Sequence, residues 1–239
     1  MTIAYFDCFS GICGDMILGA LFDLGLDQNF FLNEINKLNI NGYSIEVKKL
    51  KKNHISATDV YIEVKEKQHH RSYSDISELI NKSSLSDDIK AKSINIFHKL
   101  AVVESRIHQI NINEVHFHEI GAVDSIIDIV GSVIGLKYLE IEKVFSSKLP
   151  LGKGFVNCLH GIIPIPAPAT LELLKDIPVY QTETNHEMIT PTGAAIITSI
   201  AFVFGEMPPM KIKKIGYGAG KIKSEYPSLL RIILGDLDI

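Results

Sequence analysis

The sequence predicts an α/β (or α+β) fold, with a mixed sheet and helices in a single large domain or two closely packed subdomains. Helix-like and strand-like hydrophobic patterns alternate along the chain, which is typical of this class. The 239 residues, 46% of them hydrophobic, are enough to bury a sizeable core. No internal repeat divides the chain. We therefore expect one region, 1–239, with possible subdomains at 1–68 and 72–239.

The N-terminal quarter predicts three strands and two helices. The apolar run IAYFD at 3–7 is typical of a short buried strand, and a glycine-containing turn separates it from an amphipathic helix at 16–24. Helical spacing returns at 30–38. Apolar and polar residues then alternate in SIEVKKL and TDVYIEV, which predicts half-buried strands at 44–50 and 58–64.

The middle of the chain is predicted to be mostly helical. A charged, non-periodic segment, KEKQHHRSYS, is expected to be a surface loop and is followed by helices at 74–81 and 86–108. Ser86 and two aspartates after it supply an N-terminal signal for the second helix. The stretch HFHE is expected to be a strand, and a further helix is expected at 123–139.

The last third is predicted to contain short elements around proline and glycine. The segment 150–168 ends in IPIPAPAT, which cannot be helical until after Pro168. At 187–205 a TPTG turn is expected to lead into an apolar helix. The remaining elements expected in this half are strands at 141–146, 211–215 and 229–234, a short helix at 170–175, and a glycine-rich loop, GYGAG, at 216–220.

Composition excludes several classes of protein. A net charge of −4 and a pI near 6.1 argue against a nucleic-acid binder that relies on neutralising phosphates. The three cysteines are an odd number without CxxC spacing, which fits reduced thiols better than a disulfide framework. No signal peptide is evident, and the longest apolar stretches are too short to span a bilayer. We therefore expect a cytoplasmic protein that binds neither nucleic acid nor membrane.

The segment HFHEIGAVDSIIDIV is the first candidate site. Two histidines alternate, so on a strand they share a face, and two aspartates four residues apart share a face of the following helix. Imidazole and carboxylate ligands suit a divalent transition metal. Each of these residues alone is more simply a solvated side chain, but together they favour a metal site. The candidate metal ligands are His116, His118, Glu119, Asp124 and Asp128.

A second group of candidates surrounds two predicted helix starts. The turn DCFSGICGD lies between a strand and a helix, whose N-terminus can hold an anion, although a purely structural tight turn is about equally consistent. EMITPTG opens another helix, where a simple N-cap is an equally good interpretation. His160 lies beside a glycine in a proline-braced loop. The candidate catalytic residues are Asp7, Ser10, Asp15 and His160, and the candidate cofactor-binding residues are Gly11, Gly14, Thr190, Thr192 and Gly193.

Taken together, these segments resemble the LarC family, the nickel-insertion proteins of the lactate racemase system. The matching stretches are YFDCFSGICGDMILGAL, VHFHEIGAVDSIIDIVG, PLGKGFVNCLHGIIPIPAPATLELL, EMITPTGAAI, and GYGAG followed by LLRIILG. The resemblance implies a lyase-type chelatase that inserts nickel into pyridinium-3,5-bisthiocarboxylic acid mononucleotide, forming carbon–nickel and sulfur–nickel bonds. It also implies CTP hydrolysis with manganese or magnesium, and a product used by lactate racemase and related enzymes.

The chain departs from the family pattern in several places. Only His69 and His70 remain of a histidine-rich loop, Cys13 replaces a usual serine, and Ser228 replaces a usual asparagine. The C-terminal domain that the family associates with CTP is absent, so we expect this region to need that part, or a chain carrying it, as a partner. A homo-oligomer is also possible. Two alternatives stay open: a non-catalytic nickel carrier, and a metal-dependent phosphoester hydrolase.

Overall fold

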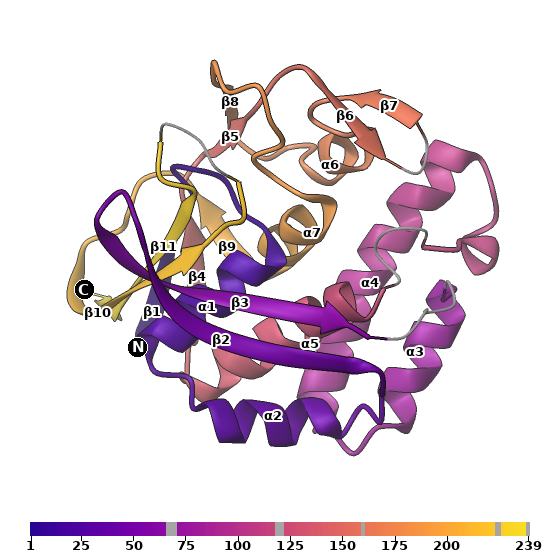
Figure 1. Cartoon of the computed structure of the whole chain (residues 1–239), viewed down its shortest axis with the longest axis horizontal. Coiled ribbons are helices and arrows are strands. Elements are labelled where there is room, and N and C mark those ends of the chain that lie inside the picture. The colour runs from indigo at the N-terminus through magenta and orange to yellow at the C-terminus, as the bar shows by residue number, and fades with distance from the viewer. Residues whose placement is uncertain (66–70, 118–121, 159–160, 223–225, 238–239) are drawn as a thin grey trace.

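The computed structural model describes residues 1–65, 71–117, 122–158, 161–222 and 226–237. It confirms an α/β arrangement built on a seven-stranded mixed sheet (Figure 1). In their order across the sheet, the strands are β2 (Tyr43–Lys52), β3 (Ile55–Val64), β10 (Met210–Ala219), β11 (Leu229–Leu237), β1 (Thr2–Asp7), β4 (Lys143–Ser146) and β9 (Ala201–Phe204).

The strand pairing joins both ends of the chain in this sheet. The interior strand β1 pairs antiparallel with β11 and parallel with β4, and β4 pairs parallel with β9. The β2–β3 hairpin joins the sheet where β3 pairs parallel with β10. The strands β1, β2 and β3, which belong to the possible subdomain 1–68, therefore share one sheet with the C-terminal strands.

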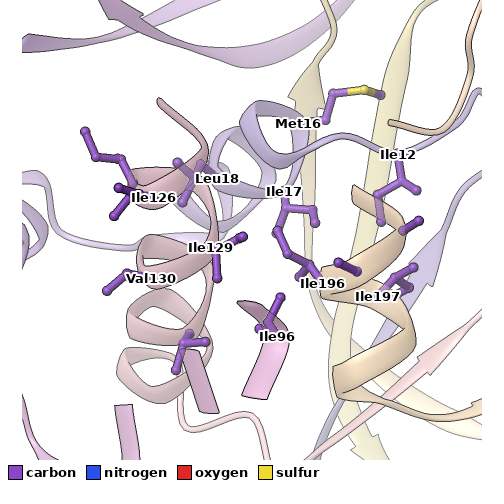
Figure 2. Close-up of a cluster of buried hydrophobic side chains, with 14 of the residues drawn as sticks. Ile12, Met16, Ile17, Leu18, Ile96, Ile126, Ile129, Val130, Ile196 and Ile197 are labelled. Carbon is purple, nitrogen blue, oxygen red and sulfur yellow. The ribbon is translucent and has the colours of Figure 1, made fainter. Parts of the chain in front are cut away.

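The helix α1 (Gly14–Leu24) packs directly on the sheet, and α4 (Asp87–His108) lies against other helices instead of strands. The bounds of the other helices are α2 (Gln28–Asn36), α3 (Tyr73–Lys82), α5 (Val123–Tyr138), α6 (Pro168–Leu173) and α7 (Pro191–Ile200), with a 3₁₀ turn at Ile112–Glu114. Figure 2 shows how α1, α5 and α7 interdigitate through isoleucine, leucine and valine side chains, with Ile96 of α4 beneath them. This packing fixes the relative positions of the three helices.

Two small sheets lie in the proline-rich region and were not predicted. The strands β5 (Leu149–Leu151) and β8 (Val179–Gln181) pair in parallel, whereas β6 (Phe155–Cys158) and β7 (Gly161–Pro164) form a hairpin. No helix among the residues that the structure describes is long and apolar enough to cross a lipid bilayer.

The apolar helix predicted within 187–205 is shorter than expected. It ends at Ile200, and the next four residues, AFVF, form the edge strand β9. Aromatic and β-branched residues favour an extended conformation when an open sheet edge is available, and here β4 offers that edge. The strand predicted at HFHE is also not formed by its described part, where His116 makes only an isolated bridge to Ser72.

The glycine-rich segment 216–220 was predicted as a loop, and this prediction was wrong. The strand β10 continues through it to Ala219. The helix α1 lies so close to β10 that a Cβ added at Gly218 would be 1.8 Å from the carbonyl oxygen of Met16. The glycines are therefore required because a helix backbone packs directly on this strand, and not because the chain turns there.

Candidate functional site

The N-terminal ends of three helices meet at one cavity of about 440 Å³. The helices α1, α5 and α7 converge there because their next turns share the apolar cluster described above (Figure 2). Each helix contributes its first residues to the wall, and each N-terminus carries a partial positive charge. The helix and cap residues that line the cavity are Cys13, Gly14, Asp15 and Met16 from α1, Asp124, Ser125 and Asp128 from α5, and Thr190 and Thr192 from α7.

Asp15 is held in a fixed orientation at the start of α1. Its Oδ1 accepts hydrogen bonds from the Cys13 thiol at 2.7 Å and from the backbone N–H of Met16 at 2.8 Å. Burial raises the pKa of Asp15, while the Cys13 hydrogen bond and the charge of Lys221 act in the opposite direction. Burial and the neighbouring Asp15 raise the pKa of the Cys13 thiol well above its usual value, so the thiol stays protonated.

Asp128 is the least compensated carboxylate of the cavity. Its Oδ1 is buried and has no hydrogen-bond partner among the residues that the structure describes. Burial, followed by the charges of Asp15 and Asp124, raises the pKa of Asp128 well above its ordinary value. The side chain fits only because residue 14 is glycine, since a Cβ there would be 2.3 Å from Asp128 Oδ2.

Lys221 is the basic residue on the opposite wall. Its ammonium forms an ion pair with Asp59, donates to the Val60 carbonyl at 2.9 Å, and lies 3.8 Å from Asp15 Oδ2. This lysine directly follows the GYGAG strand segment, so the close packing of α1 on β10 also brings Lys221 to the cavity. One ammonium cannot neutralise the carboxylates that face it.

The glycine and threonine candidates join the Ser10–Asp15 turn to the start of α7. The Ile12 N–H donates to the Met188 carbonyl at 2.9 Å, and a Cβ at Gly193 would be 2.4 Å from the Ile12 carbonyl oxygen. Gly11 has φ +97°, and its added Cβ would overlap the same Met188 carbonyl. The Thr190 hydroxyl accepts from the Gly193 N–H at 3.1 Å, which confirms the N-cap interpretation. Cofactor binding by these residues stays a prediction.

The structure separates the other candidates from this cavity or leaves them undescribed. Asp7 accepts a hydrogen bond from Arg231 Nε at 3.0 Å and does not line the cavity. His116 is exposed and also lies outside the lining. The remaining predicted residues, His118, Glu119 and His160, lie outside the described residues. Of the predicted site residues, the cavity brings together Ser10, Gly14, Asp15, Asp124, Asp128, Thr190 and Thr192.

No three histidine, cysteine, aspartate or glutamate side chains in the described part of the chain are arranged to hold one metal ion. Sequence reasoning had not assigned Cys13, His186 or Lys221 to a site. For Lys221, the available signal in the sequence was its position directly after the glycine-rich segment GYGAG.

The fold and the cavity define a class: an α/β protein whose carboxylates, gathered in one cavity at converging helix starts, offer oxygen ligands of the kind that divalent cations bind. A family model described as "Nickel insertion protein" matches residues 4–238, and the chain belongs to this family. The predicted resemblance is thereby confirmed. No solved structure matches the chain.

Relatives with curated names extend beyond this chain. A protein of Dictyoglomus thermophilum named "Putative nickel insertion protein" is 53% identical over 99% of this chain and 61% of its own length. Proteins of Desulfitobacterium hafniense (strain DSM 10664) and Acetivibrio thermocellus, each named "Pyridinium-3,5-bisthiocarboxylic acid mononucleotide nickel insertion protein", are each 47% identical over 99% of this chain and 59% and 61% of their lengths. The chain thus spans about three fifths of these relatives.

Proposed function

We propose that this region takes part in inserting nickel into pyridinium-3,5-bisthiocarboxylic acid mononucleotide, giving the nickel-pincer cofactor of lactate racemase-type enzymes. The observation that carries the proposal is the family match across almost the whole chain, together with relatives that are named for this reaction. The carboxylate cavity supports it, because it places oxygen ligands where a metal ion and a small molecule could meet.

Nickel is the cargo in this proposal, so its ligands must bind it and also release it. Carboxylates and imidazoles meet this need better than a closed thiolate cage. We assign the incoming ion to Asp124 and Asp128, with His116, His118 and Glu119 as the further ligands that sequence reasoning suggests. The sulfur atoms of the substrate would replace some of these ligands as the ion is transferred.

The substrate is proposed to lie beside the Ser10–Asp15 turn. Ser10 lines the cavity and is available as a hydroxyl donor, while Asp15 and the starts of α1 and α7 surround the same space. Asp7 and His160 belong to this proposal as predicted catalytic residues. The Met16 N–H already donates to Asp15 and is therefore not available to a phosphate. A phosphate would bind here through other groups around the turn.

The described glycine segments do not fit CTP. Gly216 and Gly218 are covered by the α1 backbone, with added Cβ atoms 2.4 Å and 1.8 Å from carbonyl oxygens of α1, so their strand cannot wrap around phosphates. Lys221 is engaged by Asp59 and is not followed by a serine or threonine. We therefore assign CTP, with manganese or magnesium, to the further length that the relatives possess.

A nickel carrier that acts with a separate CTP-using part is the second candidate. It is favoured by the cavity carboxylates, which offer metal ligands, whereas the described glycine segments offer no loop that fits phosphates. Assaying formation of the nickel-bound mononucleotide by this chain, by the remaining part of a relative, and by both together in excess free nickel separates the two. Formation that still requires this chain supports a role in insertion, and formation by the remaining part alone supports a carrier, because excess nickel replaces delivery.

The metal assignment has its own test. The double variant His116→Ala, His118→Ala should lose nickel binding measured by calorimetry, because it removes both imidazole ligands. The matched control is His108→Ala, which changes a histidine on α4 that pairs with Glu104. Unchanged nickel affinity in a folded double variant would remove these histidines from the site.

A further inference from the structure

An open groove of about 690 Å³ continues from the carboxylate cavity. The two spaces share Ser10, His186 and Met188 in their walls. Three aromatic side chains line the groove and remain exposed: Phe9 at 38%, Tyr180 at 44% and Tyr226 at 71%. Aromatic rings gathered in a concave wall next to a polar cavity are typical of a site for a flat ligand.

The groove walls are held in place before any ligand binds. The ring of Phe9 lies under the guanidinium of Arg231, 5.6 Å from its centre, and Arg231 is fixed by its ion pair with Asp7. The opposite wall, residues 182–188, is pinned to the strand β5 and its extension. The Thr182 N–H donates to the Leu151 carbonyl at 2.9 Å, and the Thr184 carbonyl accepts from the Lys153 N–H at 2.8 Å.

Close packing adds to this rigidity. A Cβ added at Gly152 would be 1.9 Å from the His186 carbonyl oxygen, so the backbone of this wall lies directly on the glycine. A wall fixed in this way loses little conformational entropy when a ring binds against it.

The charges lining the groove and cavity favour a ring with a positive charge. Among the described residues, Glu183 is the charged side chain that lines the groove, where it pairs with Lys153, so the excess negative charge comes from the cavity, with Asp15, Asp124, Asp128 and Glu187 against Lys221. Burial lowers the pKa of His186, so this histidine at the junction is neutral near pH 7. The electron-rich faces of exposed tyrosine and phenylalanine rings attract cations as well.

We propose that this aromatic groove binds the pyridinium ring of the mononucleotide, with Tyr180 as the main stacking surface. This inference rests on the proposed function for the identity of the ring, but its class, a flat cationic heteroaromatic ring, follows from the groove itself. A ring bound here would present one edge past Ser10 and Met188 to the cavity carboxylates. The groove thus positions the ring, and the cavity brings the metal to its edge.

The test uses two probes of the same shape that differ in charge: the 1-methylnicotinamide cation and neutral nicotinamide. Calorimetric titration into this chain should show tighter binding of the cation. Replacing Tyr180 by Leu should weaken binding of the cation by about three- to thirtyfold, which is the range of cation–π contributions, while Tyr180→Phe should retain most of it. Tyr138→Leu, which changes an exposed tyrosine packed on Phe30 of α2, is the matched control and should change nothing.

Equal affinity for the two probes, or full binding of the cation by a folded Tyr180→Leu variant, would overturn the groove assignment. Phe9→Leu tests the same groove through a second aromatic ring if Tyr180→Leu does not fold. The outcome is separable from the proposed function. If the groove assignment fails while nickel insertion occurs with the added C-terminal part, the proposed function stands and the ring binds elsewhere. If the cation binds as described and no insertion occurs under any condition, the groove stands and the insertion proposal falls.

Discussion

Replacing Gly218 by alanine tests the packing that brings α1 and Lys221 to the cavity. The new Cβ would lie 1.8 Å from the Met16 carbonyl oxygen and 2.7 Å from the Ala20 nitrogen, where ordinary contact begins at 3.4 Å. Both obstructing atoms belong to the helix backbone, so no side-chain rotation relieves the overlap and α1 has to move by roughly 1.5 Å. Overpacking in a core typically destabilises a protein by about 1–3 kcal/mol. For Gly218→Ala we expect a loss of folding free energy at the upper end of this range or above it.

Thermal and urea unfolding, followed by circular dichroism, measure this cost. For a chain of this size, a loss of about 3 kcal/mol lowers the melting temperature by roughly 6–12 °C. The control is Gly154→Ala, where no atom lies within 4 Å of the new Cβ but φ is +105°, so that only backbone strain of about 1–2 kcal/mol is expected. If Gly218→Ala were no more destabilising than this control, α1 would not lie against β10 as described.

Two further predictions concern charge and nucleotide. Because the pKa of Asp128 is raised in the folded state, its ionisation opposes folding as pH rises from about 4 through the folded pKa. Asp128→Asn should therefore be more stable than the parent at pH 7, and the difference should shrink on acidification towards pH 4; a difference independent of pH would contradict this. Titrating CTP with manganese into this chain should show weak binding or none, and tight stoichiometric binding would place the nucleotide site within these residues.

The helices were the most predictable part of the fold because their signals are local. The helix predicted at 86–108 is Asp87–His108, and the one predicted at 123–139 is Val123–Tyr138. Hydrophobic periodicity and N-terminal residues are enough for such segments. In contrast, β9 and the end of β10 depend on neighbours distant in sequence. The glycines of 216–220 carry a turn signal locally, and only the position of α1 explains why they are in a strand.

The candidate site was predictable only in part for the same reason. Sequence spacing correctly placed Asp124 and Asp128 on one face of α5, since four residues make about one helical turn. It could not show that Asp15, more than a hundred residues away, faces them. That contact depends on the glycine at position 14, where any larger residue would meet the Asp128 carboxyl group. Gly14, which the sequence suggested as a cofactor contact, thus leaves the space in which the two carboxylates approach each other.

The position of each carboxylate explains how the fold tolerates so much negative charge in one cavity. Asp15 and Asp124 are the second residues of α1 and α5, where the partial positive charge of a helix start stabilises an ionised group by about 0.3–1 kcal/mol. Asp128 lies one turn further along α5, beyond most of this effect, and its buried Oδ1 has no partner among the described residues. Its charge is therefore the least compensated of the three. A divalent cation entering the cavity would relieve this repulsion, and its departure would restore it, so the arrangement favours accepting a metal ion, and release in the proposed transfer needs the substrate sulfurs to compete for it.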